Sequence, residues 1–113
     1  MEKLISTTIN QYTYRISFSP EDSAHIGRCL EFPSLASHGK TPVEALSEIQ
    51  SVVGASIKWM KQEKEEIPEP LGSKKFSGHL SLRIPVDLHR DLALSAADTG
   101  VSLNQYILSK VAK

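Results

Sequence analysis

The sequence contains a single cysteine, Cys29, among its 113 residues. One thiol cannot form an internal disulfide, and it cannot build a zinc site on the usual number of thiolates. The four histidines, His25, His38, His79 and His89, show no spacing typical of metal ligands. We therefore expect a reducing compartment, a buried and inert Cys29 thiol, and neither a metal nor a cofactor.

Long apolar runs are missing as well. No stretch approaches the ~20 consecutive apolar residues of a membrane helix, and the first residues lack the unbroken apolar core of a secretory signal. We therefore expect a soluble protein of the cytoplasm.

The net charge is zero, but the charges are not evenly distributed. Residues 1–70 carry seven Lys or Arg against ten Asp or Glu, a net charge of −3, whereas residues 71–113 carry six against three, a net charge of +3. This asymmetry suggests that the basic half meets nucleic acid and that the acidic half meets another partner, for which a basic protein is one option. Chance scatter in a short chain is the alternative.

The first half begins with strand patterns. Residues 11–19 alternate strictly between apolar and polar side chains, which predicts a half-buried strand. Turn-forming residues at 19–23 predict a reversal into a second strand over residues 24–32. The pair at 33–34, Pro-Ser, interrupts the ladder before a short third strand over residues 35–39. Such a meander needs a helix to cover its apolar face.

A helix follows at once. Thr41 is placed to cap it, Pro42 suits its first position, and Glu44 favours its first turn. Trp59 lies on this helix, next to its apolar face, and we expect it in the core. One face of the helix is apolar and predicts the cover of the sheet: Leu46, Ile49, Val53, Ile57 and Met60.

Two prolines and a glycine then prevent the helix from continuing through Ile-Pro-Glu-Pro-Leu-Gly-Ser at residues 67–73. We place a linker at residues 67–76, with a short fourth strand as an option near its beginning. The chain is thus divided into one domain over residues 1–66 and another over residues 77–113.

The second domain opens with a short alternating stretch at residues 77–85. Successive side chains of a strand point to opposite faces. The polar ones share one face: His79, Ser81 and Arg83. The apolar ones share the other: Leu80, Leu82 and Ile84. Because a domain of about 40 residues has little to bury alone, we infer that two copies pair these strands.

Two helices follow the stretch. Pro85 ends the strand and lets residues 86–99 begin as a helix, which Gly100 closes. The next helix has a strong start signal, since Ser102 and Gln105 have the spacing of a capping box.

This order of strand, helix and helix resembles the ribbon-helix-helix fold of the Arc and MetJ repressors. The resemblance rests on His-Leu-Ser-Leu-Arg-Ile-Pro followed by Gly-Val-Ser-Leu-Asn-Gln-Tyr-Ile. In that family an intertwined dimer lays a two-stranded ribbon in the major groove. The resemblance implies that His79, Ser81 and Arg83 face base edges. It also implies that the start of the second helix holds a DNA phosphate, at Ser102, Leu103 and Asn104.

General chemistry agrees with both roles, because arginine bonds bidentately to guanine and a helix N-terminus offers free amides to an anion. An edge hairpin whose polar face is merely solvated is the alternative.

A second resemblance covers much of the first half. Two stretches resemble the HicB family of antitoxins: Gly-Arg-Cys-Leu-Glu-Phe-Pro-Ser-Leu at residues 27–35 and Ser-His-Gly-Lys-Thr-Pro-Val-Glu-Ala-Leu at residues 37–46. Its members neutralise a small HicA-type ribonuclease toxin, and they bind DNA through a C-terminal helix-turn-helix or ribbon-helix-helix. This chain is similar to the second kind.

The two resemblances together imply an α+β protein: a degenerate ribonuclease H-like β-β-β-α(-β) domain followed by a ribbon-helix-helix (β-α-α) dimerisation domain. They imply an antitoxin that binds its toxin directly, represses its own operon, and forms a homodimer or a higher-order oligomer. We assign the toxin contact to Glu21, Asp22 and Glu31.

Two other functions stay open. A metal-dependent ribonuclease of ribonuclease H-like fold would use carboxylates to hold two Mg²⁺ ions. Glu21 and Asp22 lie in an expected turn, however, and Glu44 lies in a first helical turn, where acidic residues favour the helix dipole. Only Glu31 is expected to face a sheet surface, so we predict no catalytic residues and no enzyme. A solitary repressor whose first domain binds a small ligand is the third possibility.

Overall fold

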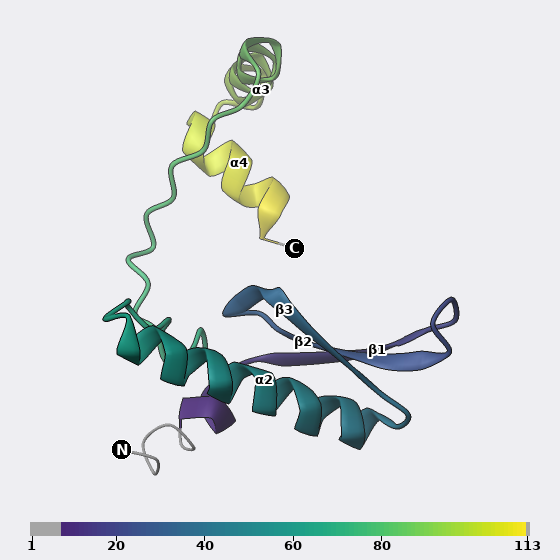
Figure 1. The fold of residues 1–113 in the computed structure, drawn as a ribbon. Helices are drawn as coiled ribbons and strands as arrows, with labels where there is room; N and C mark the ends of the chain where they lie inside the picture. Colours follow the sequence, from purple (N-terminus) through teal and green to yellow (C-terminus); the bar gives the residue numbers. More distant parts are fainter. Residues whose placement is uncertain (1–7, 113) are drawn as a thin grey trace. The chain divides into compact units, whose positions relative to one another are not determined.

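The computed structural model describes residues 8–112 of an α+β chain (Figure 1). The chain divides into two compact units, one ending at Phe76 and the other beginning at Ser77. We call them the N-terminal unit and the C-terminal unit and describe each by itself. Among the described residues, no helix is both long enough and apolar enough to cross a membrane.

The N-terminal unit contains a three-stranded antiparallel sheet, as the alternation predicts. Its strands are β1 (Tyr14–Ser19), β2 (Ala24–Cys29) and β3 (Phe32–Gly39), and they pair in chain order. β1 begins three residues later than expected because residues 8–11 are helical.

The third strand is longer than predicted, since it begins at Phe32 and continues through Pro33. Cys29 pairs with Phe32 and Arg28 pairs with Ala36, so residues 33–35 form an irregularity on β3. Pro33 is tolerated because it lies within this irregularity on an edge strand, where a missing N–H costs no ladder bond. The predicted boundaries are therefore wrong here: β2 ends at Cys29 instead of residue 32, the chain turns at residues 30–31, and residues 33–34 lie within β3 instead of before it.

Helix α2 (Pro42–Gln62) starts where the sequence predicts. The Thr41 hydroxyl accepts a hydrogen bond from the backbone N–H of Glu44 at 3.1 Å, and Pro42 occupies the first turn. The helix lies along one face of the sheet (Figure 1). Its buried side chains recur at four-residue spacing and face the strands: Ala45, Ile49, Val53 and Ile57.

The core between α2 and the sheet is small. Tyr12 and Phe32 meet edge to face with ring centroids 5.3 Å apart. Gly27 on β2 lets the helix approach, because a Cβ added there would lie only 2.6 Å from the carbonyl oxygen of Ala45. The first glycine of the HicB-like stretch is thus required by packing.

Part of the expected linker is attached to the N-terminal unit. The Tyr12 hydroxyl donates to the carbonyl of Pro68 at 2.7 Å, the backbone N–H of Leu71 donates to Glu31 at 2.9 Å, and Ile67 packs against the core. The optional fourth strand is not formed, since residues 65–76 contain neither helix nor strand.

The C-terminal unit contains α3 (Val86–Thr99) and α4 (Leu103–Val111). Gly100 closes α3 with a positive φ of 78°, and the predicted capping box of α4 is complete. Residues 77–85 form no strand in this single chain, which differs from the expectation. A strand exists through its ladder of hydrogen bonds, and the expected partner was a second copy.

Candidate functional site

The start of the C-terminal unit exposes both faces of the alternating stretch. The apolar side chains Leu80 and Leu82 are 89% and 72% exposed. The polar side chains His79, Ser81 and Arg83 are exposed as well. Arg83 makes no ion pair within residues 8–112. Of the six residues on the two faces, only Ile84 is half-buried within the unit.

A hollow of about 590 Å³ lies between this stretch and α4, and its lining combines apolar side chains with the polar His79, His89 and Asn104. Leu80, Leu82 and Ile84 line one side of it, and Leu103 and Ile107 line the other. Burial of apolar surface is the main favourable term in folding and association, so this hollow leaves the C-terminal unit short of a core.

The first turn of α4 shows which groups remain free for an anion. The Ser102 hydroxyl accepts from the N–H of Gln105 at 3.1 Å, and the Gln105 side chain accepts from the N–H of Ser102 at 3.2 Å. The first backbone N–H groups of a helix have no partner inside it, which leaves those of Leu103 and Asn104. Both point out of the helix start, where the dipole favours negative charge.

The acidic residues assigned to the toxin do not form one group. Glu21 and Asp22 lie together and exposed in the β1–β2 turn, where Nε2 of His38 is 4.0 Å from Asp22. Glu31 lies in the turn between β2 and β3, at the other end of the strands, and is only 9% exposed.

Glu31 is engaged inside the N-terminal unit. Its Oε1 accepts from the backbone N–H of Thr13 at 2.9 Å, and its Oε2 accepts from the N–H of Leu71 at 2.9 Å and from the Thr13 hydroxyl at 3.2 Å. Burial alone raises the pKa of this carboxyl, but the N–H groups of Leu71 and Thr13 stabilise the carboxylate and hold its pKa below the ordinary 4.5. The carboxylate joins β1, the β2–β3 turn and the linker.

The Cys29 thiol is buried and lies 3.5 Å from Oε1 of Glu31. Burial raises the pKa of this thiol to about 11, so it is protonated and a poor nucleophile at neutral pH. Across residues 8–112, no three His, Cys, Asp or Glu side chains converge as a metal site would require.

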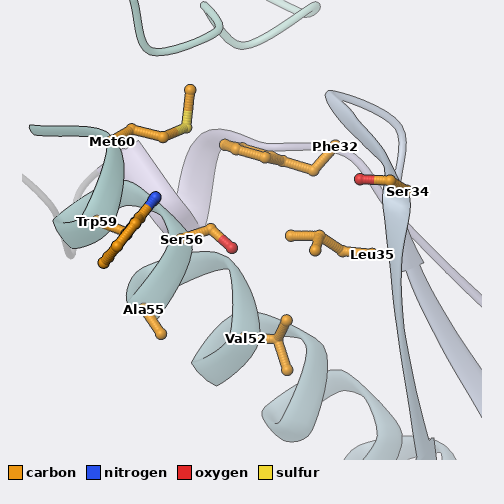
Figure 2. Close-up of a pocket in the computed structure, with 8 residues that line it drawn as sticks. All are labelled: Phe32, Ser34, Leu35, Val52, Ala55, Ser56, Trp59 and Met60. Carbon is orange, nitrogen blue, oxygen red and sulfur yellow. The ribbon is translucent and has the colours of Figure 1, made fainter. Parts of the chain in front are cut away.

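An apolar hollow that the sequence patterns did not indicate lies between α2 and β3, with a volume of about 570 Å³. Figure 2 shows Leu35 reaching from β3 toward Val52 and Ser56 of α2, with the Trp59 ring at the rim. Phe32 and Met60 complete its apolar lining.

The expectation that Trp59 lies in the core is wrong, because its side chain is 61% exposed. The signal was present in the sequence. Trp59 lies two residues after the buried Ile57, which turns it about 200° away from the core face at 3.6 residues per turn.

The comparisons concern the second half of the chain. The model of the HicB family matches residues 61–111, which include the end of α2, the linker and nearly all of the C-terminal unit. No curated protein and no solved structure matches the chain. The stretches at residues 27–46 that resemble HicB antitoxins lie outside the matched range. The match over residues 61–111 is consistent with a protein of a toxin–antitoxin system and supports membership of the HicB family.

Proposed function

We propose that this protein is the antitoxin of a type II toxin–antitoxin system. It neutralises a small HicA-type, mRNA-cleaving toxin by direct binding in the cytoplasm and represses its own operon by binding operator DNA. It has no catalytic residues of its own. The match to the HicB family supports the toxin–antitoxin assignment, and the two units suit the two tasks.

The exposure of Leu80 and Leu82 is the observation that best supports the DNA-binding part of this proposal. Apolar side chains that alternate along an extended stretch and stay 89% and 72% exposed need a partner surface. A second copy supplies it if the two stretches pair as an antiparallel ribbon and their apolar faces close the hollow beside α4. The C-terminal unit is then the ribbon-helix-helix dimer that the sequence resembles.

Pairing of the ribbon leaves His79, Ser81 and Arg83 together on the outer face. In this arrangement Arg83 bonds to a guanine edge, and the two other side chains add hydrogen bonds in the same groove. The free N–H groups of Leu103 and Asn104 hold a backbone phosphate, with the Ser102 hydroxyl as a further donor. Base contacts specify the operator, and phosphate contacts position the dimer.

The N-terminal unit is proposed to hold the toxin as a degenerate ribonuclease H-like domain. Trp59 and the apolar hollow beside it offer an anchor of the kind that dominates protein interfaces. Glu21 and Asp22 are exposed and attract a toxin whose RNA-binding surface is basic. Glu31 is better suited to joining the linker than to touching a partner, because its oxygens are already engaged.

A ligand-responsive repressor is the second candidate function. The hollow beside Trp59 has the volume of a small-molecule site and a mainly apolar lining. Under this alternative a small apolar ligand binds there and no toxin is involved.

Two assays test the proposal. The tagged full-length chain, expressed together with the gene beside its own, should retain a small basic protein through purification. The same preparation should retard a DNA fragment from the promoter region of the operon. Retention of DNA binding with no protein partner would favour the solitary repressor, and loss of both would refute the antitoxin.

A further inference from the structure

The face of the sheet opposite α2 carries a pair of arginines. Gly27 and Cys29 of β2 are buried beneath α2, so Arg28 between them points to the opposite face. The register places Arg15 of β1 directly across from Arg28. Both arginines are exposed.

Arg15 and Arg28 are direct cross-strand neighbours. The N–H of Leu30 donates to the carbonyl of Thr13 at 2.9 Å, which marks a hydrogen-bonded cross-strand pair. Such pairs recur every two residues, so Arg15 and Arg28 form the next one, with Cα atoms about 5.5 Å apart. Neither arginine makes an ion pair within residues 8–112.

Like charges directly across a ladder destabilise a sheet. The arginine pair therefore costs the N-terminal unit stability on its own and is relieved by an anion. A guanidinium fork suits a phosphate or a carboxylate, and the Ser17 hydroxyl on the same face adds a donor. Glu21 and Asp22 line the same hollow as Ser17 and Arg28, but neither carboxylate makes an ion pair with Arg15 or Arg28 within residues 8–112.

Several features favour the DNA backbone as the anion. Beside the arginines, Tyr14 of β1 points to the side of α2, and the His38 ring on this face lies 4.0 Å from Asp22, so the arginine pair has no aromatic neighbour on which unpaired bases could stack. The N-terminal unit ends at Phe76, and the chain continues directly into the C-terminal unit at Ser77. The arginine pair is therefore carried to any duplex that the C-terminal unit binds, and tethering makes even a weak contact effective.

We propose that the open sheet face of the N-terminal unit is a second DNA-backbone contact, in which Arg15 and Arg28 bind phosphates flanking the operator. This contact rests on the proposed DNA binding by the C-terminal unit. It adds affinity and salt dependence without sequence preference, since phosphates carry no base information.

The test uses the full-length chain and the variant R15Q/R28Q. The matched control is K58Q/K64Q, which removes two exposed cations, one in the last turns of α2 and one just after its end. Two duplexes from the promoter region of the operon serve as probes. One covers the operator alone in about 20 base pairs, roughly two helical turns, and the other adds flanks to about 40 base pairs. Affinities are measured over a series of salt concentrations, with circular dichroism as a folding control.

R15Q/R28Q should bind the long duplex roughly tenfold more weakly at low salt, and its logarithmic salt slope should fall by about 0.9 for each lost phosphate contact, or about 1.8 per copy. Binding to the short duplex and binding by K58Q/K64Q should stay unchanged. An unchanged salt slope of R15Q/R28Q on the long duplex would overturn the proposal. The proposal would also fail if R15Q/R28Q lost a co-purified protein but bound DNA as the wild-type chain does, because the sheet face would then contact a protein. If the wild-type chain binds neither duplex, the proposed DNA-binding function fails, whatever the variants show.

Discussion

Replacing Glu31 by glutamine tests how the linker is attached to the N-terminal unit. The Glu31 carboxylate accepts two backbone N–H groups, from Thr13 and Leu71, one on each oxygen. Glutamine keeps the size of the side chain but offers one oxygen and one NH₂ group. The NH₂ group cannot accept a hydrogen bond, so one of the two N–H groups loses its partner.

The expected cost follows from this count. A buried donor left without a partner costs about 1–3 kcal/mol, and bonds to a charged group contribute about 1.5–3 kcal/mol. Because both hydrogen bonds are only part-buried, we expect Glu31→Gln to lower the free energy of unfolding of the N-terminal unit by about 1–2 kcal/mol. Loss of the Leu71 bond should also increase amide exchange at residues 67–71.

The pH dependence has a definite sign. The pKa of Glu31 is lowered in the folded state, so the carboxylate contributes stability above its ordinary pKa of 4.5, and this contribution is lost as the pH falls through the folded-state pKa. The wild-type chain should therefore lose its advantage over Glu31→Gln in acid. Urea unfolding of both chains, at neutral pH and at a series of acidic values, measures the difference.

Glu48→Gln is the matched control, because Glu48 is exposed on α2. Its unfolding free energy should change by less than about 0.5 kcal/mol. If Glu31→Gln costs no more than Glu48→Gln, or if its cost does not shrink in acid, the attachment described here is refuted.

Four further substitutions test the proposed contacts separately. Arg83→Ala should cost about 1–3 kcal/mol of operator affinity without unfolding the chain, and Ser81→Ala should weaken operator binding less. A gel-shift titration measures the affinity, and circular dichroism checks the fold. Unchanged affinity of Arg83→Ala would exclude the assignment of this side chain to the major groove. Trp59→Ala should weaken toxin binding by about 2 kcal/mol or more at nearly unchanged melting temperature. Calorimetry measures the loss, with Val43→Ala as the control because it truncates another exposed apolar side chain of α2. Equal effects of the two substitutions would show that the hollow beside Trp59 is not the anchor. Leu82→Asp should leave the chain monomeric in sedimentation equilibrium, and a dimer that persists would contradict ribbon pairing.

The features that the sequence predicted correctly are local ones. The alternation before Ser19, the cap at Thr41 and the capping box at Ser102 each depend on residues within a few positions of one another. Such patterns predict the structure correctly because the short segment that contains the pattern also makes the hydrogen bonds.

The features that could not be predicted depend on distant residues or on another chain. Glu31 joins Thr13 and Leu71, which lie 18 and 40 positions away, so no window of the sequence shows its role. The Arg15–Arg28 pair follows from the register of two strands. The stretch at residues 77–85 has the pattern of a strand but lacks a strand to pair with, because its proposed partner is a second molecule.

In the proposed function, one chain both neutralises a toxin and represses its operon. The most direct measurement expresses the toxin gene from the same operon with the full-length chain, scoring colony formation for neutralisation and a promoter reporter for repression. The wild-type chain should restore colonies and silence the reporter, Arg83→Ala should restore colonies but leave the reporter active, and Trp59→Ala should do the reverse. Continued toxicity in the presence of soluble, folded wild-type chain would contradict the account.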